Sequence, residues 1–569
     1  MTECAPALPL SHGRNPRLHH PARKGDGQCA TTGTRRPAPS SPRSPPPNPN
    51  GCAMLDLRTA LLEELREIAA QPVPPFDPAL ADDFAATGRR LPYETQYFAR
   101  RRHLAALAVA GEAAALSSLI KDVCQERSWA LPAHWGEDFD PRTCVDLFAC
   151  ETAQTLAEIL RLREDVEGRE QVEAEIRERV LDPFFEAEFP FWWEMRISNW
   201  TAVCAGAAGM AALALGYDID QIRGRVLPAL QSYLFSFGPD GGCVEGVYYW
   251  IYGFGYFTYF AEAWREATGE DLLEGNEAIA AFPARAQLYP GSFATFGDTE
   301  GDPLLPAGLF TRLHDRLGVD LPAASRPQRF ADDECARWAP LTRTLAWGRP
   351  LPEEVAPART LLPEVGWFVE RRRIGRRMWA LAVKGGYNEE PHNHLDLGSF
   401  IIAVDGEQLL CDPGSGEYTA AYFGEERYEQ VHPSAAWHSV PTVEGAAQQP
   451  GEDSRAELVD GPAGVEVYVD AYGDGALIRK FAWTGDGIAL GDFGPEITES
   501  FVSRIRPELE GDRAVWTGER GTVVLHGVNP EDAVVDSVDT ADHRGVRDRL
   551  WALRFGLPAE SPGLRFELL

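Results

Sequence analysis

Apolar residues recur at helical spacing through the first part of the chain. Between about residues 54 and 345, segments such as DLRTALLEELREIAA and CVDLFACETAQTLAEILRLRE place apolar side chains at i, i+3 and i+4. Gly, Pro and Asp separate these segments, as expected where helices end. No period is regular enough to define a sequence repeat. The pattern predicts many helices that form a closed or partly closed array of helical hairpins.

The pattern changes after a short segment rich in proline. We predict a linker over residues 346–360, which contain the sequence GRPLPEEVAPART. Over residues 361–569, short runs such as GVEVYVDAYG alternate apolar and polar residues and end at Gly or Asp. Many runs of this kind indicate a large antiparallel β-sandwich. The fold class is therefore α+β, with a helical domain at 54–345 followed by a β-domain at 361–569.

The N-terminal segment differs from both of these domains. Residues 1–53 contain RRPAPSSPRSPPPNPN, a composition typical of disorder, and an alternative start at Met54 would make the segment a misassigned extension. The segment lacks the apolar core of a signal peptide, and the chain has no apolar run of about 20 residues. We therefore expect a cytoplasmic protein that does not bind membranes.

Charge and cysteine content narrow the classes of function. The net charge of -32 argues against a nucleic-acid-binding protein, because contacts to phosphates require clustered Lys and Arg. An acidic substrate would need a locally positive pocket or a metal ion. The ten cysteines are scattered without a CxxC pair, so neither a disulfide framework nor a cysteine zinc site is expected.

Histidines gather in one short part of the predicted β-domain. His392 and His394 lie in PHNHLDLGSF, and His438 follows in AAWHSVPTVEG. If the first segment is a β-strand, His392, His394 and Asp396 would share one face. Imidazole and carboxylate groups are ligands that suit zinc, so His394, Asp412 and His438 are candidate metal ligands. The alternative is that each histidine is merely hydrogen-bonded or exposed.

Other polar residues are candidates for proton transfer and charge stabilisation. His392 could act as a general acid or base, or could be a structural histidine beside a metal. Asn199 could cap a helix, or its amide could stabilise a developing oxyanion. Tyr249, Tyr252 and Tyr256 fall on one face of a predicted helix, where aromatic residues usually form a core. A tyrosine near the helix start could instead present its hydroxyl to a substrate.

These segments together resemble the heparinase II/III-like family of polysaccharide lyases. The resemblance extends from about Met54 onward and is strongest in HNHLDLGSF, LLCDPGSGEYTAAYFGEERY and WHSVPTVEG, with SNWTAV and DGGCVEGVYYWIYG in the helical half. It implies an incomplete (α/α) toroid followed by an antiparallel β-sandwich, with the active site between them. It also implies β-elimination at a uronic acid, in an oligosaccharide or polysaccharide.

The resemblance assigns a role to each candidate residue. Asn199 would neutralise the substrate carboxylate, Tyr249 would be the acid and also serve as base, and Tyr252 is the second choice for that tyrosine. His392 would complete the catalytic set as base or charge neutraliser. The metal ligands would be His394, Asp412 and His438, around a divalent ion, most simply zinc, with a mainly structural role. The resemblance gives Asp396 no role; our own interpretation is that it supports one of the histidines by a hydrogen bond.

Two departures and two alternatives accompany this interpretation. Many lyases of the group carry a histidine where this chain has Trp200. Many are also exported, whereas this chain shows no export signal, which makes a short imported oligosaccharide a more plausible substrate than a polymer. A glycoside hydrolase would need two carboxylates, for which Glu245 and Asp298 are available. A catalytically silent carbohydrate-binding scaffold is the second alternative. A homo-oligomer is compatible with the sequence.

The different roles given to His392 and His394 require a particular local structure. Strand residues two apart point the same way. If one histidine serves catalysis and the other the metal, the chain must bend between them or place both on a shared rim.

Overall fold

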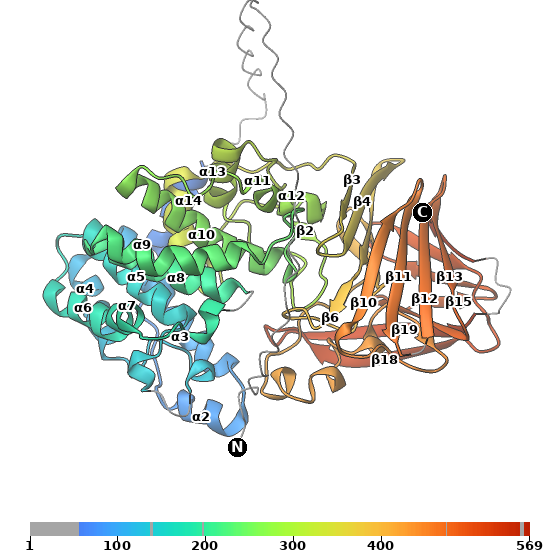
Figure 1. Cartoon of the computed structure of the whole chain (residues 1–569), viewed down its shortest axis with the longest axis horizontal. Helices are drawn as coiled ribbons and strands as arrows, with labels where there is room; N and C mark the ends of the chain where they lie inside the picture. The colour runs from blue at the N-terminus through green and yellow to red at the C-terminus, as the bar shows by residue number, and fades with distance from the viewer. Residues whose placement is uncertain (1–55, 137–139, 196–197, 474, 558–562) are drawn as a thin grey trace, which may run out of the picture. The chain divides into compact units, whose positions relative to one another are not determined.

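The computed structural model describes residues 56–136, 140–195, 198–473, 475–557 and 563–569 of the chain. The predicted extension at 1–53 lies outside the described residues. Helices dominate up to residue 347 and antiparallel strands follow from residue 358 (Figure 1). This order of helices and strands is the one that the sequence pattern predicts.

The helical half contains the α-helices and several shorter helical turns. The α-helices are α1 Leu57–Ala69, α2 Leu80–Thr87, α3 Leu91–Ala110, α4 Ala113–Gln125, α5 Leu147–Leu162, α6 Arg169–Ile176, α7 Asp182–Glu186, α8 Asn199–Ala214, α9 Ile219–Leu234, α10 Gly246–Thr268, α11 Glu277–Ala280, α12 Phe282–Ala286, α13 Ala307–Leu317 and α14 Trp338–Trp347. The shorter turns across the chain are η1 Pro132–His134, η2 Pro141–Thr143, η3 Arg177–Leu181 (π-helical), η4 Trp192–Met195, η5 Phe330–Asp332, η6 Ala421–Phe423, η7 Arg427–Glu429 and η8 Ala435–Trp437.

Helix α8 owes its central position to small residues. Its sequence NWTAVCAGAAGMAALA is buried along nearly all of its length, and it packs against α5, α9 and α10. A Cβ atom at Gly206 would lie 3.1 Å from the carbonyl oxygen of Tyr256, and one at Gly209 would lie 2.6 Å from the Phe260 ring. Glycine is thus required for this close approach. The approach aligns α8 with α10 and places Asn199 beside the first turns of α10.

The strands form one small sheet and three larger ones, and every pairing between them is antiparallel. The strands are β1 Gln287–Tyr289, β2 Ser292–Phe293, β3 Ala358–Leu362, β4 Trp367–Ile374, β5 Arg377–Lys384, β6 Gly386–Asn388, β7 Phe400–Val404, β8 Glu407–Leu410, β9 Thr442–Val443, β10 Gly451–Asp460, β11 Gly464–Tyr472, β12 Gly475–Trp483, β13 Gly487–Phe493, β14 Ile497–Ser503, β15 Glu508–Glu510, β16 Arg513–Thr517, β17 Thr522–His526, β18 Val534–Ala541, β19 Arg547–Gly556 and β20 Leu564–Leu568.

The three larger sheets enclose a hydrophobic core made of side chains from the β-domain. Nine strands run in the order β15-β16-β17-β20-β13-β12-β11-β10-β6, five in the order β3-β4-β5-β7-β8, and four in the order β18-β19-β14-β9. Buried and exposed positions alternate along β10 and β11, as the sequence pattern predicts for strands with one buried face. The ring of Phe400 packs against those of Phe481, Phe501 and Phe566 at centroid distances of 5.1 to 6.1 Å.

Two details differ from the predicted pattern or bear on it. Strands β1 and β2 interrupt the region expected to be helical; they join at the turn Pro290-Gly291, and β1 packs against β4 and β5. The last helix ends at Trp347, and β3 begins at Ala358, inside the predicted linker. The domain boundaries drawn from the sequence stay a prediction.

Among the described residues, no helix has the length and apolarity needed to cross a membrane.

Candidate active site and metal centre

The segment PHNHLDLGSF is a series of turns and not a strand. Residues 391–399 have no strand pairing, and β7 begins only at Phe400, so the strand interpretation is wrong. His392 adopts a φ of 59°, in the left-handed region that non-glycine residues rarely occupy. Its carbonyl accepts a hydrogen bond from the N–H of Asp298 at 3.0 Å, and a side chain at Gly297 would collide with that carbonyl. The bend lies just before His394, and the two histidines contact different oxygens of Asp298.

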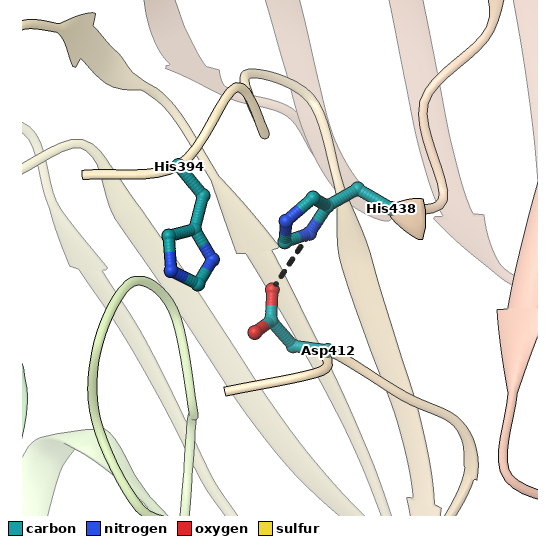
Figure 2. A group of neighbouring side chains, drawn as sticks. All are labelled: His394, Asp412 and His438. Atoms are coloured by element: carbon teal, nitrogen blue, oxygen red, sulfur yellow. Dashed lines mark ion pairs between the residues drawn. The ribbon is translucent and has the colours of Figure 1, made fainter. Parts of the chain in front are cut away.

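His394, Asp412 and His438 converge as the spacing predicts (Figure 2). All three side chains are buried, and one potential ligand atom of each lies within 4.8 Å of the others. His438 Nδ1 lies 3.2 Å from Asp412 Oδ2, and the rings of His394 and His438 are 5.1 Å apart. Three separate segments between residues 394 and 438 therefore meet at one point of the β-domain.

The hydrogen bonds of these residues fit a metal site. Among the described residues, His394 Nδ1, Asp412 Oδ2 and His438 Nδ1 are buried atoms without a hydrogen-bond partner. The other nitrogen of each ring is engaged: His394 Nε2 with Asp298 Oδ1 at 2.8 Å, and His438 Nε2 with the carbonyl of His432 at 2.8 Å. Orientation of a ligand imidazole through its second nitrogen is usual in metal centres. In this part of the structure, His394 Nδ1 has no partner among the described residues, and the other two atoms face only each other at 3.2 Å, so a cation between the three would satisfy all of them.

Asp396 does not form the supporting hydrogen bond to a histidine that we expected, among the described residues. It is buried, and its Oδ2 has no hydrogen-bond partner among the described residues. Burial raises the pKa of its carboxyl group to about 7, while the charges of Lys384 and His438 oppose that shift. Asp396 thus lies in the electrostatic field of a candidate ligand, but no hydrogen bond from it to a histidine is present in the described part of the chain.

A second group of polar residues surrounds His392, on the side facing the helical half. The ring of Tyr249, from α10, stacks on the His392 ring with centroids 4.4 Å apart and planes at 20°. His392 Nδ1 lies 3.0 Å from Asp298 Oδ2, and its Nε2 lies 3.8 Å from Glu245 Oε1. The side chain of His392 is 22% exposed, which leaves part of the ring open to solvent.

Asn199 joins this group through Glu245. Its backbone N–H donates to Glu245 Oε2 at 3.1 Å, while its side-chain oxygen has no hydrogen-bond partner among the described residues. Asn199 is the first residue of α8, after Ser198 at the cap position, so its side chain does not cap the helix. Burial raises the pKa of Glu245, against the opposing effects of His392 and the Asn199 N–H. The structure thus brings Asn199, Tyr249 and His392 together.

Tyr252 lies in a different environment from Tyr249. It lines a separate cavity of about 50 Å³ together with Tyr248, Tyr256 and Arg337. The Arg337 guanidinium stands over its ring, 4.2 Å from the centroid. One helical turn therefore separates the two tyrosines into distinct surroundings, and only Tyr249 contacts His392.

Tyr418 is a neighbour of the site that sequence reasoning missed. Its hydroxyl lies 2.6 Å from that of Tyr249, and burial raises the pKa of both phenols well above the ordinary value. Tyr418 lies in the segment LLCDPGSGEYTAAYFGEERY, six residues after Asp412. Its proximity to a candidate ligand was the available signal, but a single tyrosine in a loop gives no periodic pattern.

Asp298 connects the two groups of residues. Besides His392 and His394, it accepts hydrogen bonds from the Tyr422 hydroxyl and from Arg427 Nη2, the latter at 2.9 Å. Burial alone would raise its pKa, but the hydrogen bonds from both histidines and the Arg427 charge hold it well below the ordinary value. Asp298 is therefore a buried anion that bridges His392 and His394.

Comparison with known proteins supports the family resemblance. Residues 355–476 match the family model described as heparinase II/III-like, C-terminal. The chain carries a heparinase II/III-like C-terminal domain. The matched residues include His392 and all three candidate metal ligands, whereas Asn199 and Tyr249 lie before them. No curated protein gives a significant match.

Solved structures extend the likeness to the helical half. A crystal structure of heparinase III has a TM-score of 0.58 at 12% identity, over 84% of this chain and 77% of that one. The heparan sulfate lyase HepC from Pedobacter heparinus has a TM-score of 0.53 at 13% identity, over 90% and 87%. At such identities the likeness shows a shared fold. The predicted fold class, a helical toroid followed by an antiparallel β-sandwich, is thereby confirmed along with the heparinase II/III-like domain.

Proposed function

We propose that the protein is a lyase that cleaves a uronate-containing oligosaccharide or polysaccharide by β-elimination. The observation that carries the proposal is the stacking of Tyr249 on His392, with His392 held by Asp298 on one side and Glu245 on the other. The solved structures that share the fold include heparinase III and a heparan sulfate lyase, which favours the same chemistry.

The reaction moves one proton off the sugar and one onto the leaving oxygen. A base removes the C5 proton, which is alpha to the uronate carboxylate, and the electron pair forms the C4–C5 double bond. The bond from C4 to the glycosidic oxygen breaks, and an acid protonates that oxygen. Negative charge develops on the carboxylate as the C5 proton leaves, so a hydrogen-bond donor there stabilises the transition state. We assign that role to the side-chain amide of Asn199.

His392 is suited to remove the C5 proton. When Nδ1 carries the hydrogen and donates it to Asp298, Nε2 has a free lone pair. Asp298 then stabilises the imidazolium that forms, and its low pKa keeps it charged. The partly exposed ring gives a sugar access to this nitrogen.

Tyr249 is suited to protonate the leaving oxygen. A phenol keeps its proton at neutral pH, and burial raises the pKa of Tyr249 further above the ordinary value. Its hydroxyl is oriented by the Tyr418 hydroxyl at 2.6 Å. The two groups that exchange protons with the substrate would then be the stacked pair, His392 and Tyr249.

The hydrolase alternative is less well supported by the same geometry. Glu245 and Asp298 are both buried, and the imidazole of His392 stands between them, in contact with Asp298 at 3.0 Å and near Glu245 at 3.8 Å. Glycosidase carboxylates must instead flank the scissile bond with a sugar between them.

The proposal is tested with a panel of uronate oligosaccharides of heparan, chondroitin, alginate and glucuronan type. A lyase product absorbs in the near ultraviolet through its new double bond, whereas a hydrolase product does not. We expect an absorbance increase with at least one member of the panel. The absence of any increase, with reducing ends still appearing, would identify a hydrolase; the absence of both would favour the binding scaffold.

The two tyrosines provide a matched pair of variants. Tyr249→Phe is expected to lower kcat by about 10²- to 10⁴-fold, the usual contribution of a general acid. Tyr252→Phe removes a hydroxyl from the separate cavity and should leave kcat almost unchanged. The reverse result would transfer the acid role to Tyr252.

We also propose that His394, Asp412 and His438 bind one divalent ion, most simply zinc. Two imidazoles and one carboxylate form a common donor set for this metal. The three converging atoms without hydrogen bonds support the assignment. The ion would stabilise the β-domain at the junction of three loops. Elemental analysis of the purified protein checks its presence and identity.

A further inference from the structure

Arg90 lies close to the Tyr249–Tyr418 pair. It immediately precedes α3, and its guanidinium carbon is 5.2 Å from the ring centroid of Phe423 and 6.0 Å from that of Tyr418. Phe423 is 45% exposed, so this arrangement is open to solvent. Since the Tyr418 hydroxyl contacts that of Tyr249, Arg90 stands one side chain away from the proposed acid.

Arg90 forms no ion pair with a carboxylate among the described residues. Within the described part of the chain, no acidic group lies within ion-pair distance of it, and its guanidinium makes no hydrogen bond. The neighbouring Arg89 is bound to Glu417 at 3.0 Å. Two other arginines near the site are paired as well, Arg427 with Asp298 and Arg544 with Glu334.

The nearest acidic residue on the same helix does not neutralise Arg90. Glu94 follows one turn later and forms no ion pair in the described residues. Burial raises the pKa of Glu94, although Arg90 and His134 oppose that shift, so its carboxyl group is less readily charged than usual. In a chain with a net charge of -32, a cation left unpaired beside the proposed acid is an unusual feature.

We infer that Arg90 binds a second anionic group of the substrate, a carboxylate or a sulfate on the sugar adjacent to the one that loses its C5 proton. The inference rests on the proposed lyase function and names the substrate class for it: a saccharide that carries anionic groups on two adjacent sugars. Arginine presents paired N–H donors that match the oxygens of either group. The aromatic rings beneath it hold the guanidinium in place without cancelling its charge.

Binding measurements test this inference without relying on turnover. Isothermal titration calorimetry would compare wild type, Arg90→Gln and Arg89→Gln with oligosaccharides of one length. We expect Arg90→Gln to weaken binding of a charged oligosaccharide roughly tenfold or more, the effect of one charged hydrogen-bonded contact. Arg89→Gln should change binding little, because Arg89 is occupied by Glu417. Equal weakening in both variants would indicate general charge attraction and overturn the assignment.

Three ligands distinguish the two anions. One carries a sulfate on the adjacent sugar, one carries only a carboxylate there, and one has that carboxyl group reduced to an alcohol. A variant effect that disappears without the sulfate identifies the sulfate, and one that disappears on reduction identifies the carboxylate. An Arg90→Gln effect of the same size on all three ligands would contradict the inference.

Failure of the inference and failure of the lyase function have different signatures. Arg90-dependent binding without any ultraviolet product would reject the lyase function alone. Ultraviolet product formation with identical kcat/KM in wild type and Arg90→Gln would reject the inference alone. Binding of no charged oligosaccharide by wild type would reject the inference too. Arg90→Lys keeps the charge and should retain part of the affinity, while unchanged thermal unfolding of each variant would show that it is folded.

Discussion

At the residue scale, Asp298 shows how one carboxylate serves two neighbouring groups. One carboxylate oxygen is hydrogen-bonded to His392 Nδ1 at 3.0 Å, and the other is hydrogen-bonded to His394 Nε2 at 2.8 Å. Arg427 forms an ion pair with the same carboxylate. Its pKa lies well below the ordinary value, so it remains an anion at neutral pH and is unsuited to be an acid. A change in the position of His394 is therefore transmitted to His392 through one side chain.

The candidate metal centre gives a prediction at the same scale. His438→Ala should reduce the metal content from about one ion per chain to nearly none, because two remaining ligands hold zinc poorly. It should also lower the thermal midpoint, since Asp412 Oδ2 and His394 Nδ1 are left buried without a ligand or hydrogen-bond partner. Elemental analysis and thermal unfolding measure the two effects.

His526→Ala provides the control for that variant. His526 belongs to β17 and pairs with Glu567 at 2.9 Å, away from the converging ligands. This variant should keep its metal. Full metal retention in His438→Ala, or an unchanged midpoint when wild type is treated with a chelator, would contradict the proposed centre.

At the element scale, the packing of α8 on α10 decides which residues meet in the site. Helix α8 begins at Asn199, and Glu245 and Tyr249 lie at the start of α10. A Cβ atom at Gly253 would lie 3.1 Å from the Cα of Asn199. The separation of the two helices is therefore set by glycines, and any increase in it would lengthen the hydrogen bond from the Asn199 N–H to Glu245.

Gly209→Ala tests this dependence. The added methyl would meet the buried Phe260 ring at 2.6 Å and Val226 at 3.1 Å, so we expect a loss of roughly 1 to 3 kcal/mol in unfolding free energy. Gly224→Ala in α9 is the matched control, because nothing lies within 4 Å of its added methyl. That control should gain about 0.5 to 1 kcal/mol from helix propensity. Urea unfolding measures both, and equal stability of the two variants would refute the packing argument.

At the scale of the whole described structure, an ion-pair cluster joins the helical half to the β-domain. Glu300 and Glu334 come from the helical half, and His543 and Arg544 come from the loop between β18 and β19. His543 Nδ1 lies 2.6 Å from Glu300, and Arg544 Nε lies 2.6 Å from Glu334. The three residues Glu300, Glu334 and His543 have the spacing of a metal site, but the Arg544 charge and a protonated His543 already neutralise both carboxylates.

This cluster predicts a pH dependence of stability. Burial opposes protonation of His543, but the hydrogen bonds and charges of Glu300 and Glu334 raise its pKa to about 9 from an ordinary 6.5. A raised pKa stabilises the folded state fully below about pH 6.5, and the contribution is lost as the pH rises through 9. It amounts to roughly 3 kcal/mol at most, from 1.36 kcal/mol per pKa unit.

The expected result is a difference between two pH profiles. Between pH 6.5 and 9.5, the unfolding free energy of wild type should fall more steeply than that of His543→Gln, and the two profiles should converge at the alkaline end. His526→Gln, at the pair between β17 and β20 whose side chains are 31% and 30% exposed, should keep the wild-type slope. Parallel profiles for wild type and His543→Gln would contradict the prediction.

Local patterns in the sequence were enough to predict the order of helices and strands and most of the candidate site residues. Helical and strand periodicities depend on neighbours a few residues apart, so the order of helices and strands and the sandwich could be predicted. The ligand types and spacing of His394, Asp412 and His438 predicted a group that the fold does bring together. Asn199, Tyr249 and His392 could be listed as candidates for the same reason, because their residue types suit the chemistry.

Tertiary structure alone decided how those candidates are used. Tyr249 and Tyr252 share one helical face, but Tyr249 meets the loop that carries His392, whereas Tyr252 lies beneath Arg337 in a separate cavity. The different surroundings of His392 and His394, which contact opposite oxygens of Asp298, go with a left-handed bend at His392 that depends on the approach of Gly297. The bridging role of Asp298 and the contact of Tyr418 with Tyr249 join residues 94 and 169 positions apart in the sequence. Such contacts depend on where whole helices and loops pack, and no pattern within a short segment carries that information.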